Sequence, residues 1–218
     1  MLKATAQSTR SKKRSRRATG PDGIRDRIVH SALDTLKAEG FAGTSARAIA
    51  RSGEFNQALI FYHFGTVPDL LLAALDQISE ERLERYRAAV AGISTLTALA
   101  DCLSELYAED MKDQHITAIQ ELVSGSSSNP ALGQEIVIRL EPWMAFVEEV
   151  VGRFLKDSIF ESMVPARELA YAGIALYMGM ETLTHLDGDR VHVAELFETA
   201  KRMAPMLDMV LAQGKSDA

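Results

Sequence analysis

Apolar residues recur at spacings of three and four along most of the chain, which is the pattern of a helix with one buried face. The first such stripe begins after Asp22 and stops at Gly40, a residue suited to a left-handed helix cap. No alternation of polar and apolar residues typical of a strand occurs, and no long repeat is visible. The pattern therefore predicts an all-α chain. The residues of the first stripe are Ile24, Ile28, Val29, Ala32, Leu33 and Leu36.

Two short helices follow the first one. Thr44 is a suitable N-cap for the second helix, which Gly53 ends. A third helix is predicted over about 55–62, with Ile60 and Phe64 on its buried side. Three helices with a turn between the second and the third form a helix-turn-helix, whose third helix can lie in the major groove of DNA. Residues 21–66 are therefore predicted to form a helix-turn-helix domain.

Residues 67–218 are predicted to form a second, larger helical domain. Thr66 and Pro68 resemble the cap and first turn of a helix that runs towards Ala91. The later stripes bring the expected total to about nine helices. The five remaining helices are predicted at about 95–112, 115–124, 130–157, 166–186 and 191–212.

Charge is divided unequally along the chain. Residues 1–65 contain 12 basic and 5 acidic side chains, whereas the remainder contains 12 basic and 25 acidic ones. A basic front on an acidic body is typical of a DNA-contacting module joined to one that does not contact DNA. Residues 1–20 cannot bury enough apolar surface to fold alone. They form either a solvated tail or an arm that neutralises phosphates through Arg10, Lys12, Lys13, Arg14, Arg16 and Arg17.

Signals for other classes of protein are weak. The sequence lacks a Gly-rich phosphate loop, a paired-cysteine metal site and a nucleophile motif, so we expect no enzyme, cofactor or metal. The lone Cys102 fits a reducing cytoplasm, and no apolar run approaches the roughly 18 residues of a membrane span. The alternative to a DNA-binding protein is a helical adaptor that binds only protein. A polar cluster near one predicted turn is either an ordinary connection between helices or a metal site. Its members are His185, Asp187, Asp189 and His192.

The stretch from Ile24 to Leu71 resembles the N-terminal domain of the TetR family. The resemblance covers about 50 of 218 residues and implies a cytoplasmic homodimer that binds a palindromic operator. It further implies a transcriptional regulator, a repressor by default, that a small-molecule effector releases from DNA. The matching pieces are Gly40-Phe-Ala-Gly-Thr-Ser45, Ala48-Ile-Ala50, Phe61-Tyr-His-Phe-Gly65 and Asp69-Leu-Leu71.

The same resemblance implies a DNA-reading surface on the second and third helices. Arg47 would present a fork suited to guanine, and Gln57 an amide suited to adenine. Tyr62 and His63 would hold phosphates. If the third helix is rotated, Leu59 and Phe61 belong to the core, and His63 has packing or capping as its alternative role. The complete set is Thr44, Ser45, Arg47, Asn56, Gln57, Ala58, Leu59, Phe61, Tyr62 and His63.

The chain departs from the family pattern in three places. Gly53-Glu54 replaces the common Ala-Gly of the turn and puts an acid near the DNA. Phe61 lacks the hydroxyl of the usual tyrosine, and Val67 stands where a lysine is usual. These losses of phosphate contacts favour the basic arm as compensation.

By resemblance, the larger domain holds an effector pocket and a dimer interface made by the last two helices. Aromatic and methionine side chains suit an adaptable apolar pocket, and small residues permit close approach of helices. For both sets the alternative is ordinary packing within one chain. The pocket candidates are Tyr107, Met111, Trp143, Phe146 and Tyr177. The interface candidates are Ala172, Ala175, Leu176, Gly179, Phe197, Ala200 and Ala204.

Overall fold

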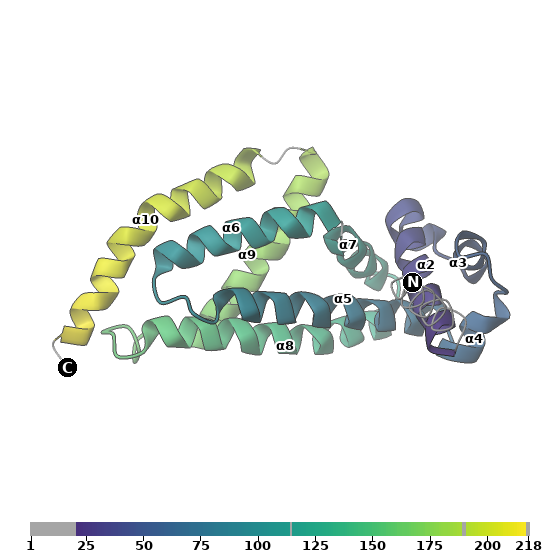
Figure 1. Cartoon of the computed structure of the whole chain (residues 1–218), viewed down its shortest axis with the longest axis horizontal. Coiled ribbons are helices and arrows are strands. Elements are labelled where there is room, and N and C mark those ends of the chain that lie inside the picture. Colours follow the sequence, from purple (N-terminus) through teal and green to yellow (C-terminus); the bar gives the residue numbers. More distant parts are fainter. Residues whose placement is uncertain (1–20, 114, 189–190, 217–218) are drawn as a thin grey trace, which may run out of the picture. The chain divides into compact units, whose positions relative to one another are not determined.

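The computed structural model describes residues 21–113, 115–188 and 191–216. Within these residues the chain forms nine helices and no strand, which confirms the all-α prediction (Figure 1). Most helix ends lie within a few residues of the predicted ones. The helices are α2 (Pro21–Gly43), α3 (Ala46–Ser52), α4 (Ala58–Phe64), α5 (Val67–Val90), α6 (Leu96–Asp113), α7 (His115–Ser126), α8 (Pro130–Leu155), α9 (Ala166–Asp187) and α10 (Val191–Ser216).

The chain divides into two compact units. The N-terminal unit takes in the described residues up to Gln77 together with Glu121–Leu132. The C-terminal unit comprises Ile78–Gln120 and the described residues from Gly133 onwards. This division differs from the predicted boundary after residue 66, because the first part of α5 and the end of α7 belong with the N-terminal unit.

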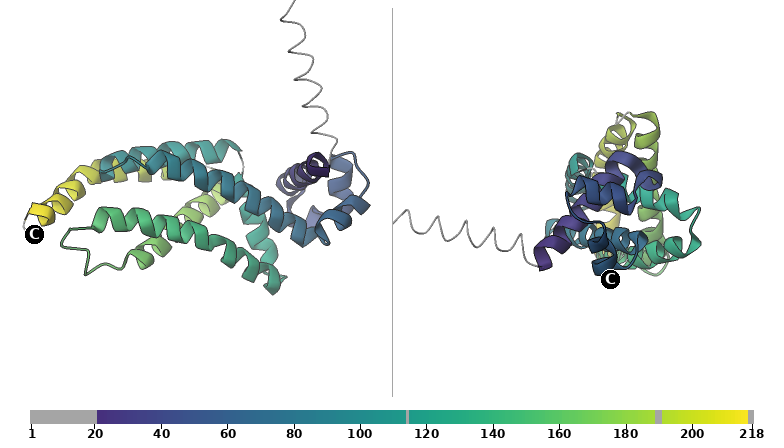
Figure 2. Two further views of the ribbon diagram at one scale, coloured as in Figure 1. Left: turned by 60° about the horizontal axis from the view of Figure 1, so that its bottom comes forward. Right: turned by 90° about the vertical axis from the view of Figure 1, so that its right-hand side faces the viewer.

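The helices of the N-terminal unit, drawn in purple to blue, lie together in Figure 2. Their apolar stripes form the core of this unit. Ile28 and Leu36 of α2, Ile49 of α3, Ile60 of α4 and Leu70 of α5 have no exposed surface. Burial of one such side chain stabilises a fold by about 1.5–3 kcal/mol. Since α4 is only seven residues long and is anchored through Ile60, much of its surface is left for another partner.

In the C-terminal unit, α10 lies along α6 (Figure 1). Asp208 of α10 caps α6, because its carboxylate accepts hydrogen bonds from the N–H groups of Leu96 at 2.6 Å and Thr97 at 3.1 Å. Burial opposes ionisation, but these bonds at a helix N-terminus hold the pKa of Asp208 below its ordinary value. A second cluster packs α5, α6 and α8 together through Tyr86, Val90, Leu106, Phe146 and Val150.

No single helix of the described residues is long and apolar enough to cross a membrane. The bent pair α4 and α5 meets that criterion jointly, by length and composition. Its most apolar residues, Ile60, Leu70 and Leu71, are buried in the core of the N-terminal unit.

Candidate nucleic-acid interface

The N-terminus of α3 is capped by Ser45. Its Oγ accepts a hydrogen bond from the Ala48 N–H at 3.2 Å. Thr44 is buried, and its hydroxyl donates to the Gly40 carbonyl at 2.6 Å. The prediction that Thr44 caps this helix is therefore wrong, because its hydroxyl is turned back to the preceding helix. A DNA contact of Thr44 stays a prediction. Ser45 itself is exposed, as the prediction requires.

The turn between α3 and α4 contains a glycine and an acid with separate structural consequences. Gly53 has a φ of −91°, which any residue adopts, but a Cβ there would collide with Ser31 Oγ and the ring of Phe55. Glu54 has a φ of +52°, in the left-handed region that favours glycine. Position 53 therefore needs a glycine because a side chain does not fit there, whereas the left-handed conformation falls on Glu54.

Replacing Glu54 by glycine should raise the free energy of unfolding by up to about 1 kcal/mol. Left-handed backbone costs an ordinary residue about 1–2 kcal/mol, and the greater freedom of glycine in the unfolded chain offsets part of the gain. Urea denaturation followed by circular dichroism measures the change. Glu54→Ala is the control, since it removes the carboxylate and keeps the Cβ. Equal stabilities of the two variants would refute this explanation.

The outward surface of α4 carries most of the predicted reading residues. Gln57 and Ala58 are exposed, and Phe61 and Tyr62 are 51% and 81% exposed. These four residues form two adjacent rows at a spacing of four, opposite the buried Ile60. Phe61 is thus not a core residue. Leu59 and His63 are half-buried at the edge of this surface, and the His63 ring packs edge-on against Tyr62 at 4.9 Å.

Asn56 has a local role that the sequence analysis did not foresee. Its side-chain Oδ1 accepts a hydrogen bond from the Ala58 N–H at 2.9 Å, which caps α4. The carbonyl oxygen of the side chain is therefore already occupied. Gln57 carries no such cap bond, and its amide is exposed on this surface.

Several cations of the N-terminal unit already have partners within the fold. Arg51 pairs with Glu39 at 2.9 Å, and Arg25 and Arg27 lie over the rings of Phe64 and Phe55 at 4.9 and 5.8 Å. The predicted base reader Arg47 is exposed on α3. The predicted arm, Arg10 to Arg17, lies outside the described residues, as does Asp189 of the alternative metal cluster.

The end of α7 completes the N-terminal unit in a way that no local pattern signals. Gly40 has a φ of +70° and interrupts α2, and the next N–H, that of Phe41, donates to Glu121 Oε2 at 2.8 Å. The Phe41 ring lies against Gly125, where a Cβ would collide with it. The bonded residues are 80 positions apart, so the sequence analysis found the interruption at Gly40 but not its partner.

A comparison with known families finds one match to this unit. Residues 28–74 match the model of the bacterial regulatory proteins of the tetR family. The N-terminal unit is therefore similar to the DNA-binding domain of the TetR family. The match includes the buried stripe of α2, the capped α3, the exposed surface of α4 and the start of α5.

Similar proteins and solved structures agree with that match. The HTH-type transcriptional repressor Rv3405c of Mycobacterium tuberculosis is 37% identical over 65 residues, which are 30% of this chain and 35% of that protein. The alignment thus spans about a third of the relative's length. The regulator FadR of Bacillus subtilis, in complex with stearoyl-CoA, superposes with a TM-score of 0.69 at 15% identity over 82% of this chain and 96% of its own. GusR of Salmonella enterica superposes with a TM-score of 0.68 at 19% identity, over 88% of this chain and 99% of its own.

Four predicted pocket residues form two aromatic pairs in the C-terminal unit. The ring of Tyr107 packs edge-on against Tyr177 at 5.9 Å, and Trp143 packs likewise against Phe146 at 6.3 Å. The Arg82 guanidinium lies over Trp143 and Tyr177 and connects the two pairs. Met111 is half-buried. Whether these residues bind an effector stays a prediction.

Arg82 pairs with the carboxylate of Asp110, which has no exposed surface. This carboxylate accepts hydrogen bonds from the hydroxyls of Tyr86 at 2.7 Å and Tyr177 at 2.9 Å, and from the guanidinium groups of Arg82 and Arg85. Burial opposes its ionisation, but the Arg82 hydrogen bond and charge hold the pKa of Asp110 below its ordinary value. We call these five residues the Asp110 cluster. It joins α5, α6 and α9, and the sequence analysis missed it.

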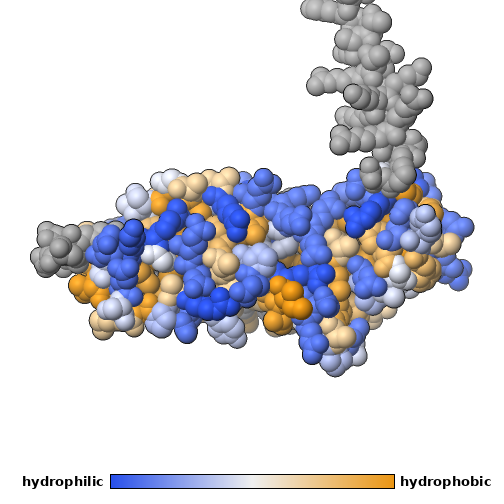
Figure 3. All heavy atoms as spheres, turned by 90° about the horizontal axis from the view of Figure 1, so that it is seen from below, coloured by the Kyte–Doolittle hydropathy of each residue, from blue (hydrophilic) through white to orange (hydrophobic). Residues whose placement is uncertain are grey.

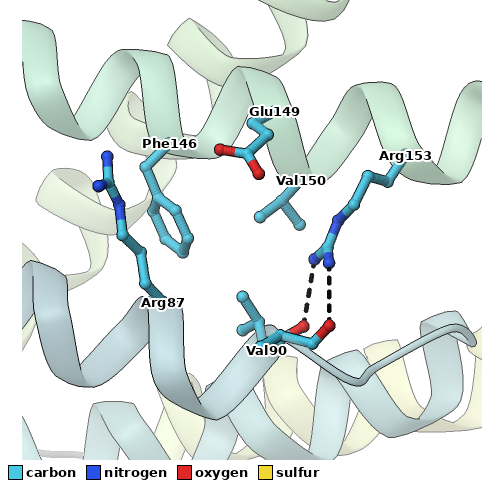
Figure 4. Close-up of a pocket in the computed structure, with 7 residues that line it drawn as sticks. Arg87, Val90, Phe146, Glu149, Val150 and Arg153 are labelled. Carbon is cyan, nitrogen blue, oxygen red and sulfur yellow. Dashed lines mark hydrogen bonds between the residues drawn. The ribbon is translucent and has the colours of Figure 1, made fainter.

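A cavity of about 370 Å³ lies between the end of α5 and α8 in the same unit (Figure 4). Of the predicted pocket residues, Phe146 lines it, together with Arg87, Val90, Ala91, Glu149, Val150 and Arg153. Figure 4 shows Arg153 reaching across to the end of α5, where it donates to the carbonyls of Val90 at 3.2 Å and Ala91 at 3.3 Å. Arg153 thus closes the C-terminus of α5. The charged lining of this cavity differs from the apolar pocket that the sequence predicted.

The predicted interface residues fall on two different faces. Ala172, Ala175, Leu176 and Ala200 are exposed, and Gly179 is half-buried. Ala204, however, is 3% exposed, and Phe197 is half-buried with its ring 5.4 Å from Tyr107. Both residues lie on the inward stripe of α10, so the burial of Ala204 argues against its place in an interface. The prediction for the half-buried Phe197 stays a prediction.

Proposed function

We propose that the chain is a sequence-specific DNA-binding transcriptional regulator that works as a homodimer on a palindromic operator. The observation that carries this proposal is the surface of α4, where an amide and two aromatic side chains are exposed opposite a single buried anchor. Such a helix fits the major groove, and its amide is suited to adenine. The family match of residues 28–74 supports the same assignment.

Substitutions on α4 should separate base reading from phosphate binding. Gln57→Ala should weaken binding to the preferred duplex by about 1–3 kcal/mol and relax the preference at one base pair of each half-site. Tyr62→Phe removes only a hydroxyl and should weaken all duplexes about equally. Fluorescence anisotropy on a duplex selected from genomic fragments, and on its single-base variants, gives both readouts. If Gln57→Ala left the preference unchanged, this placement of α4 in the groove would be refuted.

A homodimer is proposed from the outward faces of α9 and α10. Apolar exposed residues follow a three–four spacing on both helices, the pattern of helices that pack side by side. Apolar patches interrupt the hydrophilic surface shown in Figure 3, and large exposed apolar patches often mark sites of protein association. The two stripes are Leu169, Ala172, Leu176, Leu183 and Leu186 on α9, and Leu196, Ala200, Met203 and Leu207 on α10.

A charge in the middle of the α9 stripe should dissociate the dimer. Ala172→Glu would bury an unpaired carboxylate against the partner, and we expect the dissociation constant to rise at least about 100-fold. Ala89→Glu makes the same change at an exposed alanine of α5 and should leave the dimer intact. Analytical ultracentrifugation at micromolar concentration measures both. A wild-type mass of 23.9 kDa, that of one chain, would contradict the proposal.

We propose repression that a small-molecule effector relieves. The chain shares its fold with the stearoyl-CoA complex of FadR, which supports a ligand-binding role for the C-terminal helices. An effector changes DNA binding only by its difference in affinity for the two conformations of the dimer. The predicted consequence is a change in the spacing of two reading helices that must lie roughly 34–36 Å apart.

A further inference from the structure

Arg82 occupies a site built from three aromatic rings and a carboxylate. Its guanidinium carbon lies 5.2 Å from the centre of the Trp143 ring and 5.9 Å from those of Tyr86 and Tyr177. The same group binds the buried carboxylate of Asp110. Ring faces around a cation, with an anion beside it, are the means by which proteins recognise organic cations. We call this place the Arg82 seat.

The seat requires a cation but does not satisfy all the donors of Arg82. Asp110 is fully buried, so its charge needs a positive partner at that point. Arg82 is itself buried, and its Nε finds no hydrogen-bond acceptor in the described part of the chain. A buried donor without an acceptor is unfavourable. This unsatisfied donor weakens the hold of the seat on Arg82.

The carboxylate in the seat is one side chain away from solvent. Arg85, one turn further along α5, binds the other oxygen of Asp110, and its side chain is 33% exposed. Movement of this half-exposed arginine would open the carboxylate to an incoming ligand. The two oxygens of Asp110 thus face a deep cation, Arg82, and a shallow one, Arg85.

We propose that the Arg82 seat is a cation-binding site held by the chain's own arginine, and that the effector is an organic cation with a guanidinium-sized head group. The role of this ligand as the effector rests on the proposed function. The cation site itself rests only on the geometry around Arg82. The ligand replaces Arg82 beside Asp110 and keeps the buried charge balanced. Arg82 then no longer ties α5 to α6 and α9. Because α5 begins at Val67, directly after α4, this release acts on the helix that follows the reading helix.

Arg82→Ala empties the seat and makes it testable with a small probe. Ethylguanidinium should bind Arg82→Ala and raise its Tm by roughly 3–5 °C for each tenfold increase above its dissociation constant. Ethylurea, which has nearly the same shape and no charge, should not raise it. The double variant Arg82→Ala with Asp110→Asn keeps the rings and should lose the response. Trp143 is the only tryptophan of the chain, so its fluorescence reports occupation of the seat directly.

The results separate the two proposals. If Arg82→Ala folds poorly, the yield of refolding in ethylguanidinium relative to ethylurea replaces the Tm as the readout. Equal effects of the two probes, or an equal response in the double variant, would overturn the cation site. Binding of wild-type protein to DNA is measured separately. Its failure would refute the regulator while leaving the result for the seat intact.

Discussion

Asp110→Ala should lower the free energy of unfolding by about 3–5 kcal/mol, because it leaves the buried guanidinium of Arg82 without its counter-ion. The hydroxyls of Tyr86 and Tyr177 would lose their acceptor as well. Urea denaturation at pH 7 measures the difference. Glu109→Ala is the matched control: it removes the neighbouring carboxylate, which is 56% exposed and lies 3.9 Å from Arg85. An exposed pair of this kind contributes roughly 0–1 kcal/mol. Similar losses in the two variants would contradict the structural role of the Asp110 cluster.

The same cluster predicts a dependence on pH. The pKa of Asp110 lies below its ordinary value of 3.8 in the folded chain. The stabilisation from its ionised form is therefore complete above that value and is lost as the pH falls through the lower pKa of the folded state. The gap in unfolding free energy between wild type and Asp110→Asn should be constant near neutrality and should shrink in acid. A gap that grew in acid would contradict this.

Deleting residues 1–17 should lower the affinity for DNA and weaken its dependence on salt. The segment contains seven cations and no acid, whereas residues 21–65 contain five basic and five acidic side chains. Fewer cations of residues 21–65 are available to phosphates than the sequence suggests, since Arg51 is paired with Glu39. Each phosphate that is no longer neutralised flattens the log–log salt slope by about 0.9, so a loss of several units per dimer is expected.

Titrations of the selected operator over a range of salt concentrations decide between an arm and a tail. A variant with residues 1–17 in scrambled order keeps the charge and should keep the slope. The base preference should survive the deletion, because it depends on α4. Equal slopes of log affinity against log salt concentration for the full-length and shortened proteins would refute the arm.

The helices could be predicted because their signals are local. Stripes at three–four spacing and stops at residues such as Gly40 and Gly53 place the elements within a few residues of their observed bounds. The sequence left Phe61 between the DNA surface and the core, and its exposure in the structure decides for the surface. The choice between Thr44 and Ser45 as a cap did not follow, since both hydroxyls can cap and only the backbone after Gly40 decides which one does.

Contacts between distant segments were not predictable from one sequence. The bond from Phe41 to Glu121 and the Asp110 cluster join residues of separate helices, and each acid looks like an ordinary solvated one in the sequence. A retrospective signal exists for Asp110, which follows Leu106 and Tyr107 on the buried side of α6. The inward positions of Phe197 and Ala204 were missed because α10 has apolar residues on two faces.

The central claim is that α4 reads a symmetric DNA sequence, and selection from a pool of randomised duplexes tests it most directly. Wild-type protein should enrich a palindromic motif whose half-sites are centred roughly 10–10.5 base pairs, or a multiple of that, apart. Gln57→Ala, carried through the same selection, should lose the preference at one symmetric pair of positions and keep the spacing. Recovery of duplexes without a common motif, or with a motif that Gln57→Ala leaves unchanged, would contradict the account.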